Sequence, residues 1–183
     1  MDLCSRLPEN TPVGVLGTVG AWHHWAPRYG LRRLEMLVRG FAPELLCTEI
    51  NRIDWEATRL VRFSPEYREC LVPLCRELSI TVVPVGDRWR GPPSPLRLTL
   101  PLGAGPGWIN SPAADHWHRT WAQLQPRLNQ ANRELVAHIL ETVQRDPGRR
   151  VLVTVRVERR YVVVGRLSRS KKVTLLSAWT PLD

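Results

Sequence analysis

The sequence contains no long apolar run, only four cysteines and almost no lysine. Every apolar run is shorter than the roughly 18 residues that cross a membrane, so we expect no membrane partner. The N-terminal stretch Met-Asp-Leu-Cys-Ser-Arg-Leu-Pro has neither the basic start nor the apolar core of a secretory signal peptide. We therefore expect a cytoplasmic protein.

The four cysteines, Cys4, Cys47, Cys70 and Cys75, include no Cys-x-x-Cys pair. The closest two, Cys70 and Cys75, would lie on different faces of a helix. A zinc site needs ligand pairs at tight spacing, and the sequence offers none. We expect free thiols in a reducing compartment, no disulfide scaffold, no metal and no other cofactor.

The net charge is +9, and the pI is about 10.4. Such a charge favours nucleic-acid binding when the cations are clustered. Here the arginines are spread from Arg6 to Arg169 among acidic residues, and the only lysines are Lys171 and Lys172. This pattern is typical of the arginine bias of a GC-rich genome. Nonspecific nucleic-acid association is therefore only a third hypothesis, and a small anionic ligand is the partner that we expect.

The chain has 183 residues, of which 43% are hydrophobic, enough for one core. Short apolar runs alternate with segments of helical periodicity, and we expect one α/β domain over 1–183. The predicted strands cover 12–18, 45–50, 80–85, 151–157 and 173–176. The predicted helices cover 30–40, 64–78, 117–143 and 161–167.

Turn and cap residues refine these helices. Gly40 suits the C-cap of the first, and Ser64 followed by Pro65 suits the start of the second. Pro126 predicts a kink in the third. The last is ambiguous, because Val162-Val163-Val164 would equally extend a strand.

Strands that alternate with helices predict a mainly parallel sheet of about five strands, with helices on both faces in three layers. Residues 88–115 break the alternation with many prolines and glycines. We expect this Pro/Gly-rich insertion to be an irregular loop or lid.

Ligands of parallel sheets bind at the carboxyl ends of the strands. The first such end reads Gly17-Thr18-Val19-Gly20, followed by His23 and His24. Gly17 would let the backbone approach a ligand closely, and either histidine would serve as a general base. The alternative is that both histidines simply pack among the neighbouring tryptophans.

Glu49 follows an apolar stretch near the end of the second predicted strand. Burying a carboxylate is unfavourable without a partner, so Glu49 is a candidate acid/base, with a structural ion pair or simple exposure as the alternatives. Further candidates for contacting an anionic group are Asp87, Arg88, Arg133, Arg159 and Arg160. A simple turn would also explain Asp87 and Arg88, and a solvated charge run would explain Arg159 and Arg160.

Several segments together resemble the opening and closing parts of the TraB/Tiki, ChaN and erythromycin-esterase-like superfamily. They are Gly17-Thr18-Val19, the run from Phe41 to Glu49, Ser64 to Arg68, Ile80 to Arg88, Asn132-Arg133, and Gly148 to Val157. The resemblance implies an α/β fold and an active site that uses the strand-end glutamate, here Glu49, and Arg133. The family also has two histidines, with a metal in some branches.

The departures from the family concern those histidines. The first falls on Gly20, with His23 and His24 only nearby, and the second falls around Glu158 to Arg160. The resemblance therefore implies either a divergent hydrolase or a catalytically inactive binding module. In the hydrolase, Glu49, His23 and His24 would be catalytic. Gly17, Asp87, Arg88, Arg133, Arg159 and Arg160 would contact substrate.

Overall fold

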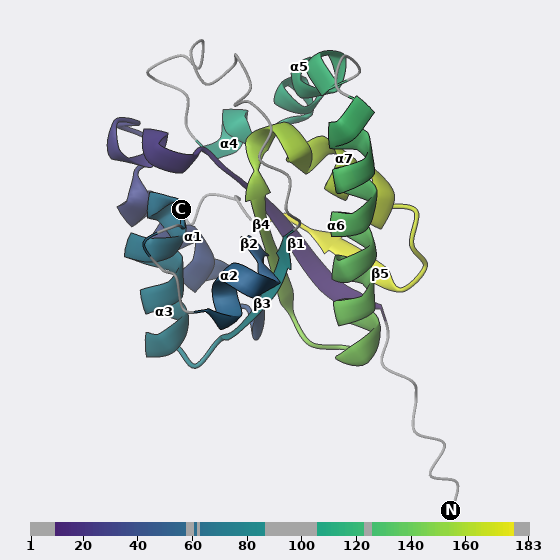
Figure 1. Ribbon diagram of the computed structural model, residues 1–183, viewed down its shortest axis with the longest axis horizontal. Coiled ribbons are helices and arrows are strands. Elements are labelled where there is room, and N and C mark those ends of the chain that lie inside the picture. Colours follow the sequence, from purple (N-terminus) through teal and green to yellow (C-terminus); the bar gives the residue numbers. More distant parts are fainter. Residues whose placement is uncertain (1–9, 58–60, 62, 87–105, 123–125, 178–183) are drawn as a thin grey trace, which may run out of the picture.

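The computed structural model describes residues 10–57, 61, 63–86, 106–122 and 126–177 (Figure 1). The strands are β1 (Thr11–Thr18), β2 (Leu45–Asn51), β3 (Thr81–Gly86), β4 (Val151–Arg156) and β5 (Val173–Leu176). The longer helices are α1 (Leu31–Phe41), α5 (Pro112–Ala122), α6 (Pro126–Arg145) and α7 (Val157–Leu167). The shorter ones are η1 (Gly20–His24), α2 (Arg52–Glu56), η3 (Glu66–Leu71), α3 (Val72–Glu77) and α4 (Pro106–Ile109).

The five strands form one parallel sheet in the order β3-β2-β4-β1-β5. Helices α1 and α3 lie on one side of this sheet, and α6 and α7 lie on the other (Figure 1). The predicted three-layer α/β fold with a parallel sheet is therefore confirmed.

Each face of the sheet has its own apolar core. Leu16, Leu46 and Leu152 pack against α1 and α3, whereas Val15 and Val153 pack against α6 and α7. Neighbouring strand residues point to opposite faces, so a strand that is buried on both faces reads as a continuous apolar run. None of the helices in the described ranges is long and apolar enough to cross a membrane.

The end of α1 differs from the prediction. Gly40 lies inside the helix, and the C-cap is Ala42, with φ of 49° and ψ of 58°. The amide of Ala42 donates to the carbonyls of Val38 and Arg39, which closes the last turn. The predicted cap was therefore two residues too early, because a left-handed cap favours glycine but does not require it.

The helix predicted from Ser64 begins as expected, since the Ser64 carbonyl accepts from the amides of Tyr67 and Arg68. Its first part is the π-helical turn η3, and α3 follows. Pro73 lies at the start of α3 and has no amide to donate to the turn before it. We attribute the wide turn to this proline, which the prediction of a single regular helix overlooked.

Three further predictions needed correction. The irregular stretch predicted for 88–115 is wrong at its end, where α4 and the first residues of α5 are helical. The segment predicted as one helix over 117–143 belongs to two helices, α5 and α6. Pro126 is the first residue of α6, a position whose amide makes no hydrogen bond within the helix, so a proline is tolerated there. The helix predicted from Tyr161 starts at Val157, so the alternative of an extended strand is wrong.

Candidate functional site

The candidate site lies at the carboxyl ends of β1, β2 and β4. These ends are neighbours because β4 pairs with both other strands. After β1 the chain continues to α1 on one face, and after β4 it enters α7 on the opposite face. Ligands of parallel sheets bind at such a change of direction.

A β-bulge positions Glu49 in this site. Thr48 pairs with Pro84 and Asn51 pairs with Gly86, so β2 contains one residue more than β3 between these pairs. The carbonyl of Glu49 comes so close to Gly86 that a Cβ there would overlap it. Bulges redirect side chains near functional sites, and this one leaves the Glu49 amide to donate to the Tyr67 hydroxyl at 3.2 Å.

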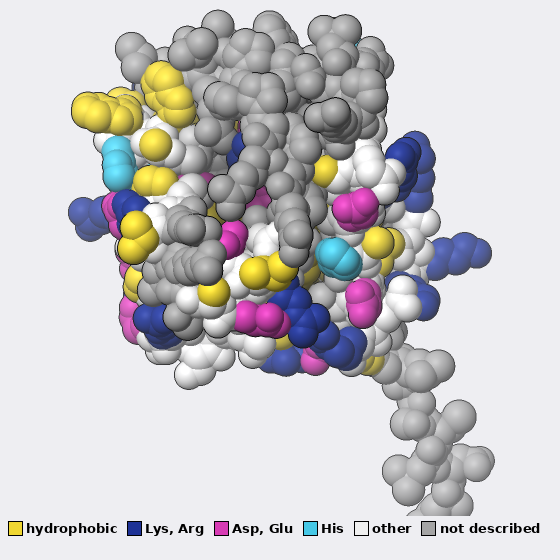
Figure 2. Space-filling model, in the orientation of Figure 1, with side chains coloured by type: hydrophobic (Ala, Val, Ile, Leu, Met, Phe, Trp, Pro, Cys, Tyr) yellow, Lys and Arg dark blue, Asp and Glu magenta, His cyan; other side chains and the backbone are white. Residues whose placement is uncertain are grey.

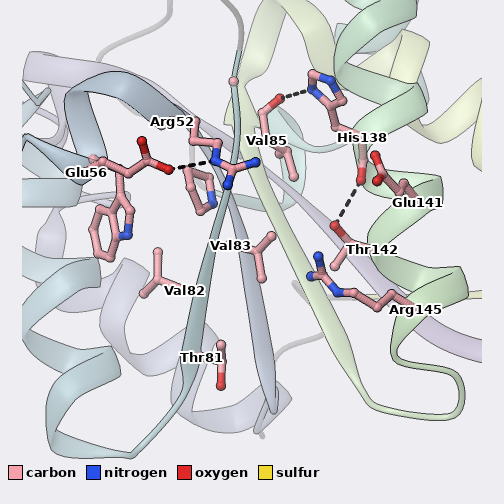
Figure 3. Close-up of a pocket in the computed structure, with 13 residues that line it drawn as sticks. Arg52, Glu56, Thr81, Val82, Val83, Val85, His138, Glu141, Thr142 and Arg145 are labelled. Carbon is pink, nitrogen blue, oxygen red and sulfur yellow. Dashed lines mark hydrogen bonds and ion pairs between the residues drawn. The ribbon is translucent and has the colours of Figure 1, made fainter.

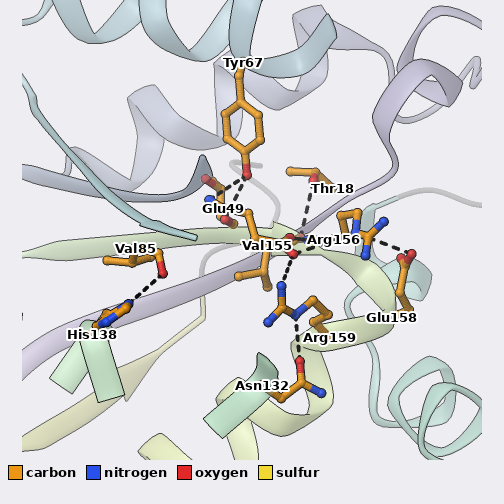
Figure 4. A network of polar contacts seen from close by, with 11 residues as sticks. Thr18, Glu49, Tyr67, Val85, Asn132, His138, Val155, Arg156, Glu158 and Arg159 are labelled. Atoms are coloured by element: carbon orange, nitrogen blue, oxygen red, sulfur yellow. Dashed lines mark hydrogen bonds and ion pairs between the residues drawn. The ribbon is translucent and has the colours of Figure 1, made fainter. Parts of the chain in front are cut away.

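Tyr67 ties this bulge to the neighbouring strand. Its hydroxyl accepts from the Glu49 amide and donates to the Thr154 carbonyl of β4 at 3.0 Å (Figure 4). The ring is buried, and burial together with the nearby charges of Glu49 and Glu66 raises the pKa of Tyr67. Tyr67 is therefore neutral, and its hydroxyl holds the backbone of Glu49 in place through these two hydrogen bonds.

Both carboxylate oxygens of Glu49 have partners. Oε1 lies 2.6 Å from Nη1 of Arg159, and Oε2 accepts from the backbone amide of Arg156 at 2.5 Å. Burial by itself raises the pKa of Glu49, but the charges of Arg159 and Arg156 outweigh it and hold the pKa below its usual value. Glu49 is therefore an ionised carboxylate at neutral pH.

Arg159 belongs to the first turn of α7, and its side chain is only 2% exposed. Its Nε donates to Oδ1 of Asn132 on α6 at 2.7 Å, so the guanidinium bridges α6 and β2 (Figure 4). Glu158 and Arg160 are buried as well. The alternative of a solvated charge run at 158–160 is therefore wrong.

Arg160, the next residue of α7, forms a second buried ion pair. Nη1 of Arg160 is 2.6 Å from Oδ2 of Asp115 on α5. Burial raises the pKa of Asp115 despite the opposing charge of Arg160. The two consecutive arginines thus each meet a carboxylate from a different element of the fold.

The backbone of Gly17 is occupied by the protein itself. Its amide donates to Oδ1 of Asn110 at 2.6 Å, and its carbonyl accepts from the Tyr29 hydroxyl at 2.6 Å. A Cβ at Gly17 would lie 3.1 Å from Oδ1 of Asn110. We expected a ligand to approach the backbone of Gly17 closely. The side chain of Asn110 occupies that position instead.

The two histidines have separate surroundings. His23 is buried, its Nε2 accepts from the Val19 amide at 3.2 Å, and its Nδ1 therefore donates to the Tyr29 carbonyl at 2.7 Å. Burial lowers the pKa of His23 to about 4. His24 is exposed, with Nε2 2.9 Å from Oε2 of Glu69. Neither histidine ring is hydrogen-bonded to Glu49.

Arg133 lies outside the network. It is exposed on α6 and donates to Gln130 on the same helix. Its neighbour Asn132 makes the contact with Arg159 instead. Asp87 and Arg88 lie outside the described residues.

Sequence reasoning missed several members of the network, namely Tyr67, Asn110, Asp115, Asn132 and Arg156. Asn132 carried a usable signal. It lies on the same helical face as Leu135 and Ile139, and a polar residue on an apolar face has to find a buried partner.

A groove of about 510 Å³ runs along β3 between α2 and α6 (Figure 3). Trp55, Val83 and Arg145 are among the residues that line it, and Nδ1 of His138 donates to the Val85 carbonyl at its wall. Pro84 suits this edge strand because it offers no amide for pairing with a further strand. The groove contains none of the residues that the sequence predicted for the site.

Within the described residues, no three His, Cys, Asp or Glu side chains are placed to hold a metal ion. No protein-family model, curated protein or solved structure matches this chain significantly. The resemblance to the TraB/Tiki, ChaN and erythromycin-esterase-like superfamily accordingly stays a prediction.

Proposed function

We propose that this chain is a binding module without hydrolase activity, and that its ligand is a small anion held at the carboxyl ends of β2 and β4. The observation that carries the proposal is the pairing of both Glu49 oxygens with Arg159 and with the Arg156 amide. A carboxylate that is held ionised and doubly hydrogen-bonded is a poor proton carrier at neutral pH.

The histidines support the same conclusion. Both ring nitrogens of His23 are engaged with backbone groups, and its low pKa keeps the ring neutral. Neither it nor the surface residue His24 is hydrogen-bonded to Glu49. A general acid or base has to lie within hydrogen-bond reach of the group it serves, directly or through one water.

Arg156 is the side chain through which an anion would enter the network. Its side chain is 22% exposed, compared with 2% for Arg159. Its Nε lies 3.7 Å from carboxylate oxygens of both Glu49 and Glu158. An incoming carboxylate or phosphate would pair with the exposed part of the Arg156 guanidinium, and the buried contact between Arg159 and Glu49 would stay in place.

Thermal unfolding in the presence of inorganic phosphate or acetate tests this proposal. Binding to the folded state alone raises the melting temperature in a saturable manner. We expect Arg156→Gln to remove this rise, and Arg76→Gln, an exposed arginine on α3, to retain it. The absence of any saturable rise, or an equal rise in the Arg156→Gln variant, would contradict the proposal.

A divergent hydrolase is the second candidate, because the bulge places a carboxylate beside an arginine where ligands of parallel sheets bind. In this case substrate would displace Arg159 and free Glu49, with His23 or His24 as a second proton carrier. An esterase, peptidase and phosphatase panel distinguishes the two functions. Turnover that falls by about 100-fold or more in Glu49→Gln, together with a loss in His24→Ala, would favour the hydrolase.

We also propose a cytoplasmic location. The support comes from Cys47, Cys70 and Cys75, which are free and buried.

A further inference from the structure

The last turn of α7 and the turn that follows it to β5 carry four cations in close succession. Arg166, Arg169, Lys171 and Lys172 are all exposed, and they include both lysines of the chain. No acidic residue occurs between Glu158 and Asp183. Dark-blue side chains project from the side of the molecule that carries this turn (Figure 2).

These four cations, which we call the basic turn, have no ion-pair partner in the described part of the chain. Several exposed arginines elsewhere do have partners. Arg39 pairs with Glu35 and Glu77, and Arg145 pairs with Asp146. The basic turn therefore differs from the interleaved charges that characterise much of the sequence.

The fold itself explains only one of these cations. The C-terminus of a helix carries about half a negative charge, which a single cation such as Arg166 in the last turn of α7 can balance. The amides of Ser168, Arg169 and Ser170 already donate to carbonyls of that last turn. The other cations repel one another, so a structural role does not account for them.

The backbone of the basic turn is well anchored. The Thr11 amide donates to the Lys172 carbonyl at 2.9 Å, and the Lys172 amide donates to Oγ of Ser170 at 3.3 Å. The turn lies at the amino edge of the sheet, one length of α7, roughly 16 Å, from Arg159 and Glu49. It is therefore independent of the function proposed above.

We propose that the basic turn binds the phosphate backbone of nucleic acid without reading its sequence. Closely spaced cations bind a polyanion favourably, because each phosphate that they neutralise releases condensed counterions. A lipid surface fits less well, since the large exposed apolar side chain nearest in sequence in the described chain is Leu176, at the far end of β5 from the turn.

The test measures binding to a labelled 20-base-pair DNA duplex and to a single-stranded RNA over a salt series. For the wild-type chain we expect log Kd to rise with log salt concentration with a slope of about 3 on DNA, from three or four phosphate contacts. We expect Arg169→Gln/Lys171→Gln/Lys172→Gln to reduce this slope by about 2 to 3 and to weaken binding by about tenfold or more at low salt.

Arg28→Gln/Arg32→Gln/Arg76→Gln is the matched control, because it removes three exposed cations elsewhere and leaves the same net charge. We expect it to bind nearly as well as the wild type, with both variants folded by circular dichroism. Equal weakening in the control would overturn the proposal in favour of net charge alone. Absence of wild-type binding to both nucleic acids would overturn it too, as would turn-dependent binding only to anionic phosphatidylglycerol vesicles.

Discussion

Nη1 of Arg159 lies 2.6 Å from Oε1 of Glu49, although 110 residues separate them in the sequence. The two side chains are 2% and 8% exposed, so each charge is removed from water and depends on the other. Removing one partner of a buried pair leaves an uncompensated charge, whereas removing both does not. This pair therefore holds β2, α6 and the start of α7 together through Asn132.

A double-mutant cycle tests this interdependence. We expect Glu49→Gln and Arg159→Met each to lower the free energy of unfolding by about 3 to 5 kcal/mol. The double variant should lose less than the sum, with a coupling of about 1 to 3 kcal/mol in urea denaturation. Glu56→Gln removes an equally close but exposed partner, that of Arg52, and should leave stability unchanged. Additive losses at Glu49 and Arg159 would contradict the interpretation.

Acid should weaken the contribution of Glu49 to the stability of the folded chain. The pKa of Glu49 is lowered in the folded state, so its stabilising effect is complete above its ordinary pKa of 4.5 and is lost as the pH falls through the folded value. We expect the stability difference between the wild type and Glu49→Gln to be constant at neutral pH and to shrink below pH 4.5. A difference that persists in strong acid would show that charge is not its source.

The lowered pKa of His23 predicts a second pH dependence of stability, at higher pH than that of Glu49. Burial lowers its pKa from 6.5 to about 4, so the unfolded chain takes up a proton that the folded chain excludes. Stability should be complete above pH 6.5 and fall by roughly 3 kcal/mol as the pH drops to 4. Urea denaturation between pH 4 and 7.5 measures this, and His23→Gln should flatten the curve. An NMR titration that places the pKa of His23 near 6.5 would refute it.

The sequence was sufficient to predict the fold because its pattern is local. A short, valine-rich run such as Val151 to Val155 is typical of a strand buried on both faces, and Pro147-Gly148 marks the turn before it. The boundary at Val157 was missed because β4 passes directly into α7. Valine is apolar in either element, so no turn residue signals the change.

The candidate site was only partly predictable, because its contacts join distant segments. Glu49 was identified from the cost of burying a carboxylate, and its partner Arg159 was among the candidates. Asn132 and Asp115 become significant only once α6 and α5 bring them to α7. The same packing leaves Arg133 at the surface, one residue away from Asn132.

The buried thiols should be unreactive in the folded protein. Burial raises the pKa of Cys47 and Cys75 to about 12 and that of Cys70 to about 11, so very little thiolate forms at pH 8. In a Cys4→Ser variant, we expect no labelling by a thiol reagent under native conditions and three labelled thiols in denaturant. Rapid native labelling would mean that one of these thiols is accessible.

Gly86 is the residue on which the bulge depends. A Cβ at this position would overlap the carbonyl of Glu49, which the bulge and the Tyr67 hydrogen bond hold in place. We therefore expect Gly86→Ala to lower the free energy of unfolding by about 1 to 3 kcal/mol.

Gly165 in α7 is the matched control for this substitution. Apart from its chain neighbours and the backbone of its own helix, no atom lies within 4 Å of a Cβ added there, so Gly165→Ala should stabilise the helix by about 0.5 to 1 kcal/mol. Urea denaturation of both variants measures whether each substitution lowers or raises the free energy of unfolding. A neutral Gly86→Ala would mean that β2 can shift away from β3 at little cost. In that event the position of Glu49 would be maintained by Arg159 and the Arg156 amide, because these contacts do not involve β3.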